Sequence, residues 1–215
     1  RLDAEQPVSQ ADSRLLSGRV DRGDRFDFRV ECLQRRAETL AHPGHGVLGA
    51  RIDLIPHQLR VAGIAASRRP PRLLLADEVG LGKTIEACLI IAQQLASGRA
   101  ARVLILVPES LVHQWFVELL RRFNLRFSIF DEERCESIEM GSPGANAFEH
   151  EQGVIAATGW LAHDAKRARQ LLDAGWDLLV VDEAHHLAWA PDAPSAEYAL
   201  VEQLAARTPG VILLT

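Results

Sequence analysis

Apolar residues gather in short continuous runs along most of the chain. Residues 102–108, 153–158 and 176–182 are almost wholly apolar, and a fourth run follows at 211–215. Strands that are covered on both faces have this composition, as in a parallel sheet with helices on each side. The pattern therefore predicts an α/β fold with a mostly parallel, doubly wound sheet.

Further strands and helices are predicted between these runs. Two shorter apolar runs, at 72–76 and 127–130, predict two more strands. Apolar residues at helical spacing predict helices over residues 52–66, 83–97, 110–122, 160–173 and 195–206. Pro56 falls in the first turn of the first helix, where a missing N–H is tolerated, and Ser110 is expected to cap the third. Residues 131–152 predict only an acidic turn or short helix and a surface loop.

The first fifty residues follow a different pattern. Residues 1–19 are polar, and from Gly18 to Leu33 apolar and polar side chains alternate, which predicts a half-buried strand. Residues 41–50 contain glycine and proline and form the clearest boundary in the chain. We therefore expect residues 1–50 to be the end of an N-terminal region with a short β extension and linker, and residues 51–215 to form the main lobe.

Composition narrows the possible partners. The chain is 47% hydrophobic and 25% charged, which is the composition of soluble globular proteins. Its net charge is −5, so any contact with nucleic acid would need a local basic patch. Three cysteines without close pairing indicate a reducing compartment. No apolar run approaches the roughly 18 residues of a membrane span, and no signal-peptide pattern is present. We therefore expect a cytoplasmic protein without a membrane partner.

The run LLLADEVGLGKT, residues 73–84, joins an apolar strand to a glycine-containing loop and a helix start. Backbone N–H groups in such a loop point at an anion, and the helix N-terminus adds partial positive charge. Lys83 would contact the β- and γ-phosphates, and the Thr84 hydroxyl would ligate Mg²⁺. The residues expected to hold ATP here are Asp77, Glu78, Val79, Gly80, Leu81, Gly82, Lys83 and Thr84. The G-x-x-x-x-G-K-[ST] pattern fails at Asp77, so a chance glycine turn before an ordinary helix is the alternative.

A second chemical signal, Asp182-Glu183-Ala184-His185, follows the apolar run at 176–182. Carboxylates at the carboxyl end of a parallel strand lie where ligands bind in this architecture. Asp182 would hold Mg²⁺ through water, and Glu183 would orient and deprotonate the attacking water. Phosphoryl transfer needs both charge neutralisation and an in-line nucleophile. The acidic first turn of a helix is the alternative, but the two motifs together predict a catalytic site formed by Lys83, Asp182 and Glu183.

These motifs resemble those of the first motor lobe of superfamily-two helicase-like ATPases. The D-E-x-G-L-G-K-T sequence at 77–84 is similar to that of the Swi/Snf branch, in which aspartate habitually stands at the Asp77 position. Bacterial members of that branch that associate with RNA polymerase are similar in the runs LIPHQL, LLLADEVGLGKTIEA, HQW, LLRRFNLRF and WDLLVVDEAHHL. The resemblance implies a RecA-like P-loop NTPase lobe that binds ATP and Mg²⁺. It also implies a motor that translocates on double-stranded DNA and promotes recycling of RNA polymerase.

The resemblance also implies roles for residues outside the two motifs. Gln58 matches the family glutamine that reads the adenine edge. Residues Pro108, Glu109 and Ser110 match a motif that contacts one nucleic-acid strand, and Thr158 matches a second such motif. No histidine or cysteine spacing indicates another metal, so Mg²⁺ is the only metal that we expect.

A second motor lobe would follow the third family motif, which would begin at Thr215. In the family that lobe supplies arginine fingers, whose loss costs about 10³ to 10⁵ in rate, so we expect the isolated chain to be nearly inactive. Three functions stay open beside a DNA translocase that works with polymerase: a strand-separating helicase, a restriction-type translocase, and a non-hydrolysing module that binds DNA or polymerase. The presence of all of Lys83, Thr84, Asp182 and Glu183 favours ATP hydrolysis.

Overall fold

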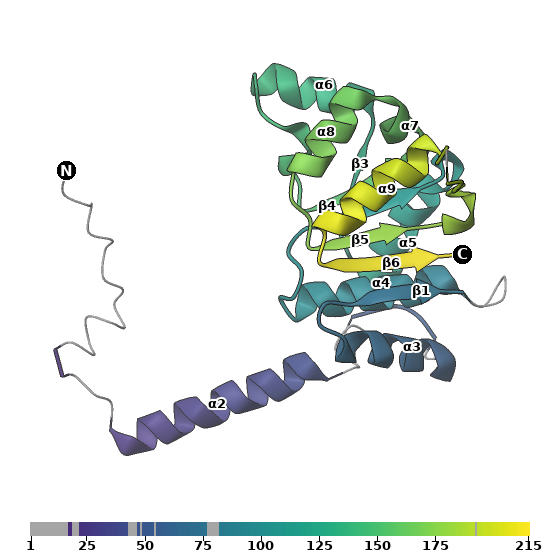
Figure 1. Cartoon of the computed structure of the whole chain (residues 1–215). Coiled ribbons are helices and arrows are strands. Elements are labelled where there is room, and N and C mark those ends of the chain that lie inside the picture. The colour runs from purple at the N-terminus through teal and green to yellow at the C-terminus, as the bar shows by residue number, and fades with distance from the viewer. Residues whose placement is uncertain are drawn as a thin grey trace. The chain divides into compact units, whose positions relative to one another are not determined.

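The computed structural model describes residues 17–18, 22–42, 47, 49–53, 55–76, 82–191 and 193–215. Contacts divide the chain into two units, residues 1–40 and 41–215. In the second unit helices cover both faces of a central sheet (Figure 1). Among the described residues no helix has the length and apolar character that crossing a membrane requires.

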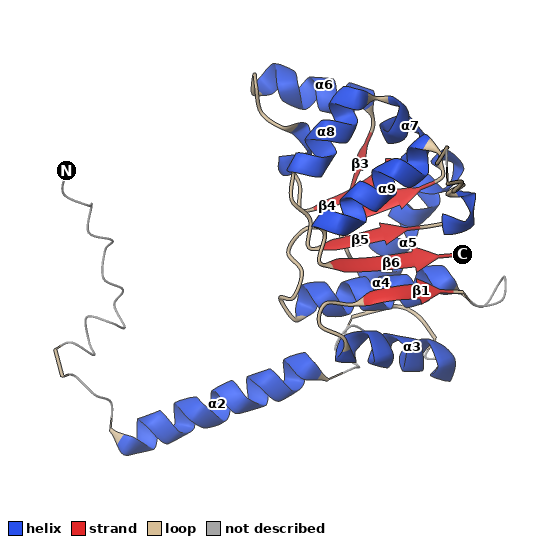
Figure 2. Ribbon diagram, viewed as in Figure 1, coloured by secondary structure: helices blue, strands red, loops and turns tan. Residues whose placement is uncertain are grey.

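The sheet has six strands, all parallel, in the order β1-β6-β5-β2-β4-β3 (Figure 2). The strands are β1 Arg72–Leu75, β2 Val103–Val107, β3 Ser128–Phe130, β4 Gly153–Ala157, β5 Leu178–Val181 and β6 Gly210–Leu214. Because all the strands run in one direction, the residues that follow them lie along one edge of the sheet, where ligands bind in this class of fold. The prediction of a doubly wound parallel sheet is confirmed.

Two hydrophobic layers hold the helices onto the sheet. On one face, Val103, Ile105 and Val107 of β2 pack with α3, α4 and α5. On the other face, Leu104 and Leu106 pack with α6, α7, α8 and α9. The helices are α3 Pro56–Ser67, α4 Lys83–Ala96, α5 Val112–Phe123, α6 Glu132–Gly141, α7 Thr158–His163, α8 Ala165–Asp173 and α9 Ala196–Arg207. Burial on both faces explains why the central strands are continuous apolar runs.

The helices differ locally from the prediction. Pro56 begins α3 as expected, although the helix starts four residues later than predicted. Ser110 does not cap α5, because it lies inside the 3₁₀ turn Glu109–Leu111 and no side chain caps the helix that follows. The single helix predicted over 160–173 is divided at Asp164, whose extended backbone ends α7 and whose side chain accepts a hydrogen bond from the Arg167 N–H. Aspartate favours this capping conformation over the helix interior.

The strand predicted over residues 18–33 was wrong, because the structure has a helix there, α2 Gly23–Ala41. Alternation predicts a strand only where one face is buried, and Phe26 is 61% exposed. A strand also needs a partner strand, and no strand in the described part of the chain pairs with this segment. The ion pair between Glu31 and Arg35, four residues apart, stabilises the helical alternative. The expected N-terminal β extension is therefore helical where it is described.

A buried arginine ties α6 to α8. Arg167 is 1% exposed, its Nη1 donates to Glu139 Oε1 at 2.6 Å, and its Nε donates to Glu132 Oε2 at 2.9 Å. Removing either carboxylate would leave the guanidinium partly unpaired in a buried position, which is strongly unfavourable. The network therefore fixes these two helices at the β3–β4 end of the sheet.

Acidification is expected to weaken this network. Hydrogen bonds from Arg167 lower the pKa of Glu132, and hydrogen bonds from Lys166, Gln170 and Arg167 lower the pKa of Glu139 to about 2. A carboxyl group with a lowered folded-state pKa stabilises the fold fully above its ordinary pKa of 4.5, and this contribution is lost as the pH falls through the folded-state pKa. The urea midpoint should fall between about pH 5 and pH 2, more steeply than in a Glu139→Gln variant, whose amide does not titrate. Equal slopes would contradict this prediction.

Candidate nucleotide site

The helix start predicted for phosphate binding lies at the carboxyl edge of the sheet. β1 ends at Leu75 at this edge, and α4 begins at Lys83. The N-cap residue is Gly82, which has no side chain that could cap the N-terminus of α4. A helix N-terminus carries partial positive charge and exposed backbone N–H groups, which suit an anion. The predicted loop contacts of Asp77, Glu78, Val79, Gly80 and Leu81 lie outside the described residues and stay predictions.

Gly82 is the last residue of the loop, and its position requires glycine. Its φ of +87° is left-handed, and a Cβ atom there would lie 2.6 Å from Nε2 of Gln58. Gln58, on α3, is 4% exposed, so its side chain is packed against the residue that precedes Lys83. The structure thus brings Gln58 to the helix start, and its role in reading adenine stays a prediction.

Asp182 is fixed at the end of β5 by three hydrogen bonds. Its N–H donates to the Leu106 carbonyl of β2 at 2.9 Å. The Glu183 N–H donates to Asp182 Oδ1 at 2.8 Å, and the Trp115 indole Nε1–H donates to Asp182 Oδ2 at 2.7 Å. Each carboxylate oxygen therefore accepts a hydrogen bond from the protein, which sets the orientation of the group.

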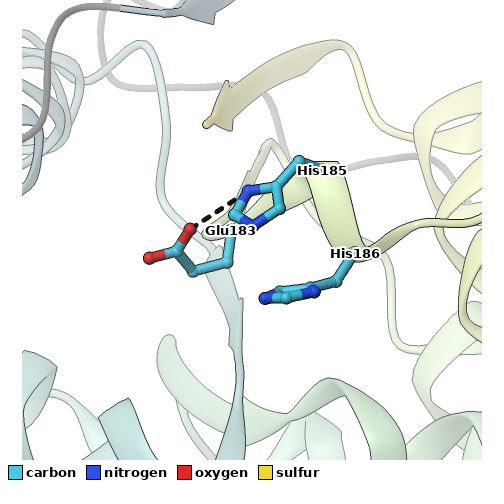
Figure 3. Close-up of side chains that lie close together, drawn as sticks. All are labelled: Glu183, His185 and His186. Carbon is cyan, nitrogen blue, oxygen red and sulfur yellow. Dashed lines mark ion pairs between the residues drawn. The ribbon is translucent and has the colours of Figure 1, made fainter.

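Glu183 has an unusual backbone conformation. Its φ and ψ of 50° and 44° are left-handed, a region that costs a non-glycine residue about 1–3 kcal/mol and that occurs disproportionately at functional sites. This conformation ends β5 and begins the 3₁₀ turn Ala184–His186. The Glu183 side chain points to His185, with Oε2 and Nδ1 3.2 Å apart (Figure 3). When His185 is protonated, the pair is an ion pair that holds the Glu183 carboxylate.

Glu183, His185 and His186 form the one cluster of possible metal ligands found among the described residues. One ligand atom from each lies within 4.8 Å of the others, and the two imidazole rings are 4.1 Å apart (Figure 3). Tetrahedral zinc with bonds of about 2.0–2.1 Å needs ligand atoms about 3.4 Å apart, so the side chains would have to move together. The cluster does not by itself indicate a second metal, and the expectation of Mg²⁺ alone stays a prediction.

The helix start and the acidic pair lie at the same edge, separated by one strand. β6 lies between β1 and β5, and adjacent strands are about 4.8 Å apart, so the ends of β1 and β5 are about 10 Å apart. Burial raises the pKa of the Cys88 thiol in the second turn of α4; Glu118 raises it further, Arg122 lowers it and Asp182 raises it. The Thr84 hydroxyl and the Asp182 carboxylate are oxygen ligands of the kind that Mg²⁺ prefers, so these residues fit the expected ion.

A cavity of about 390 Å³ opens beside the acidic pair, at the ends of β2, β4 and β5. Pro108, Glu109 and Thr158, predicted to contact nucleic acid, line it together with Asp182 and Glu183, whereas Ser110 does not. The Thr158 hydroxyl donates to the Val107 carbonyl at 3.3 Å, which ties two strand ends together. The negative carboxylates in this lining would repel the phosphates of a nucleic-acid backbone. The nucleic-acid roles therefore stay predictions.

Comparisons with known proteins assign the chain to a family. Residues 57–204, more than half of the chain, match the SNF2-related domain family. The chain is 55% identical over 214 residues to the RNA polymerase-associated protein RapA of Yersinia enterocolitica, and 54% identical to the proteins of the same name from Yersinia pseudotuberculosis and Yersinia pestis. Each of these matches covers 100% of this chain and 22% of the relative. The chain thus spans about a fifth of their length.

Two solved structures share the fold. One is the Sulfolobus solfataricus SWI2/SNF2 ATPase core in complex with dsDNA, with a TM-score of 0.63 and 23% identity, covering 77% of this chain and 32% of that chain. The other is the Sulfolobus solfataricus SWI2/SNF2 ATPase core domain, with a TM-score of 0.60 and 21% identity, covering 82% of this chain and 33% of that chain. These likenesses show the fold of this lobe and not its partners.

Proposed function

Because the chain belongs to the SNF2-related family, we propose that it is the ATP-binding lobe of a motor and hydrolyses ATP at the carboxyl edge of its sheet. The observation that carries the proposal is the Asp182 carboxylate, held by two hydrogen bonds beside Glu183 at the same edge of the sheet as the N-terminus of α4. The second motor lobe would complete the site, so the lobe alone should turn over slowly.

In this proposal each side chain has one task. Lys83 binds the terminal phosphates, and Thr84 and Asp182 hold Mg²⁺, which neutralises charge on the phosphates when bound. Glu183 accepts the proton of the attacking water. Its contact with His185, 3.2 Å from Oε2 to Nδ1, restricts the orientation of the carboxylate. Gln58 contacts the adenine from the side of α3.

We further propose that the complete protein moves along double-stranded DNA and associates with RNA polymerase. The support is the 55% identity to a polymerase-associated relative over the whole chain and the match to the SNF2-related family. The charge of −5 and the acidic cavity mean that DNA contacts would come from local surfaces, including those of the second lobe.

The test is the ATP hydrolysis rate of the complete protein, measured without DNA, with duplex DNA and with single-stranded DNA of the same length. We expect duplex DNA to raise the rate more than single-stranded DNA, and core RNA polymerase to co-sediment with the protein. Stimulation by single strands alone would favour a strand-separating helicase. Nucleotide binding without turnover in all three conditions would contradict the motor, and failure to co-sediment would remove only the polymerase partner.

A further inference from the structure

Trp115 reaches the acidic pair from a distant part of the sequence. It lies on α5, 67 residues before Asp182, and is 1% exposed. The indole Nε1–H is its single polar group, and it donates to Asp182 Oδ2 at 2.7 Å. A buried indole N–H needs a hydrogen-bond acceptor. Here the acceptor is a carboxylate that is also expected to bind a metal ion.

Trp176 provides a comparison within the same chain. It is 5% exposed, and its Nε1–H donates to the backbone carbonyl of Leu171 at 2.9 Å. That bond satisfies a buried donor without touching an ionisable side chain. The two tryptophans therefore share size and burial and differ in the group that they hold.

We propose that Trp115 is a positioning residue for Mg²⁺ at the nucleotide site, which rests on the proposed function of Asp182. The carboxylate has two donors, one on each oxygen: the Glu183 N–H and the indole N–H. The terminal torsion of aspartate is broad, so one donor alone leaves the carboxylate free to rotate. The indole N–H removes that freedom and presents the remaining lone pairs in one direction.

Trp115 is suited to orienting Asp182 because its own side chain is held in place by packing in the core. It belongs to the hydrophobic layer on one face of the sheet that also includes Ala87 and Cys88 of α4. α4 also carries Thr84, the other expected ligand, so Trp115 links the two sides of the metal site through one packed layer. Groups that orient metal ligands in this way typically change metal affinity by about 10- to 100-fold when removed.

The experiment compares Trp115→Phe with Trp176→Phe in the complete protein. Both changes replace indole by a smaller ring and remove one N–H, but only the first releases Asp182. Binding of a fluorescent ATP analogue is measured without Mg²⁺ and then as Mg²⁺ is titrated. We expect the half-saturating Mg²⁺ concentration to rise about 10- to 100-fold in Trp115→Phe, with unchanged binding in the absence of Mg²⁺. Trp176→Phe should leave both values at those of the parent.

An unchanged Mg²⁺ requirement in Trp115→Phe, or an equal shift in Trp176→Phe, would overturn the inference. A parent protein without Mg²⁺-dependent binding, or an Asp182→Asn variant with the parent's Mg²⁺ requirement, would instead overturn the proposed function. If Trp115→Phe does not fold, the parent labelled with ¹⁵N-tryptophan replaces it, with indole signals assigned from variants of the other tryptophans. The Trp115 signal should then move when Mg²⁺ is added to the ATP complex, and a stationary signal would contradict the positioning role.

Discussion

Replacing Glu183 by glutamine is expected to slow ATP hydrolysis by about 10²- to 10⁴-fold, the usual contribution of a positioned general base. The amide keeps the size of the side chain but cannot accept a proton from water. ATP binding should stay within a few-fold of the parent, because the proposed phosphate contacts come from the start of α4. Single-turnover hydrolysis and equilibrium nucleotide binding, both measured in the complete protein with Mg²⁺ and duplex DNA, separate the two effects.

Glu197→Gln is the matched control for that experiment. Glu197 lies on α9 and lines the same cavity as Glu183, so its replacement removes a charge near the site without removing the proposed base. We expect hydrolysis in this variant to stay close to that of the parent. If Glu183→Gln hydrolysed ATP as fast as the parent, Glu183 would not be the base.

Replacing Lys83 by alanine is expected to affect both binding and turnover. Hydrogen bonds to charged groups contribute about 1.5–3 kcal/mol, so ATP affinity should fall about 10- to 100-fold. A preorganised cationic donor also stabilises charge in the transition state, and its loss should slow hydrolysis of bound ATP by about 10²- to 10³-fold. Isothermal titration with ATP and a hydrolysis assay at saturating ATP measure these two effects separately.

The sequence offers a single comparison for Lys83, because its other lysine is Lys166. Lys166 lies on α8 and pairs with Glu139 at 2.8 Å, in the network that joins α8 to α6. Lys166→Ala should therefore leave ATP binding and hydrolysis unchanged. If both variants lost ATP affinity and hydrolysis rate equally, the effect of Lys83 would come from the net charge or the stability of the protein and not from contact with the phosphates.

The central sheet could be predicted from sequence because each strand carries its own signal. Residues 103–107 and 178–181 are buried on both faces, so every position in them is apolar. In a parallel sheet the carboxyl ends of the strands share one edge. Lys83 and Asp182 could be placed at the same edge of the sheet without knowing the order of the strands. Both parts of the candidate site, the helix start at Lys83 and the carboxylate of Asp182, could therefore be predicted from the sequence.

Features that depend on contacts between distant residues were missed. The alternation around Phe26 predicted a strand with one buried face, although Phe26 and Phe28 are both exposed. Trp115 could be recognised only as an apolar position of a helix, since its partner Asp182 is 67 residues away. The same holds for the buried Arg167, which pairs with Glu132 and Glu139, 35 and 28 residues away. Local periodicity carries no information about such pairings.

The most direct test of the candidate site is a crystal structure of the complete protein with a non-hydrolysable ATP analogue and Mn²⁺ in place of Mg²⁺, because anomalous scattering locates Mn²⁺. We predict a single metal ion between the Thr84 hydroxyl and the Asp182 carboxylate, with the phosphates against the N-terminus of α4. A nucleotide bound at another part of the sheet, with no metal ion near Asp182, would contradict the account.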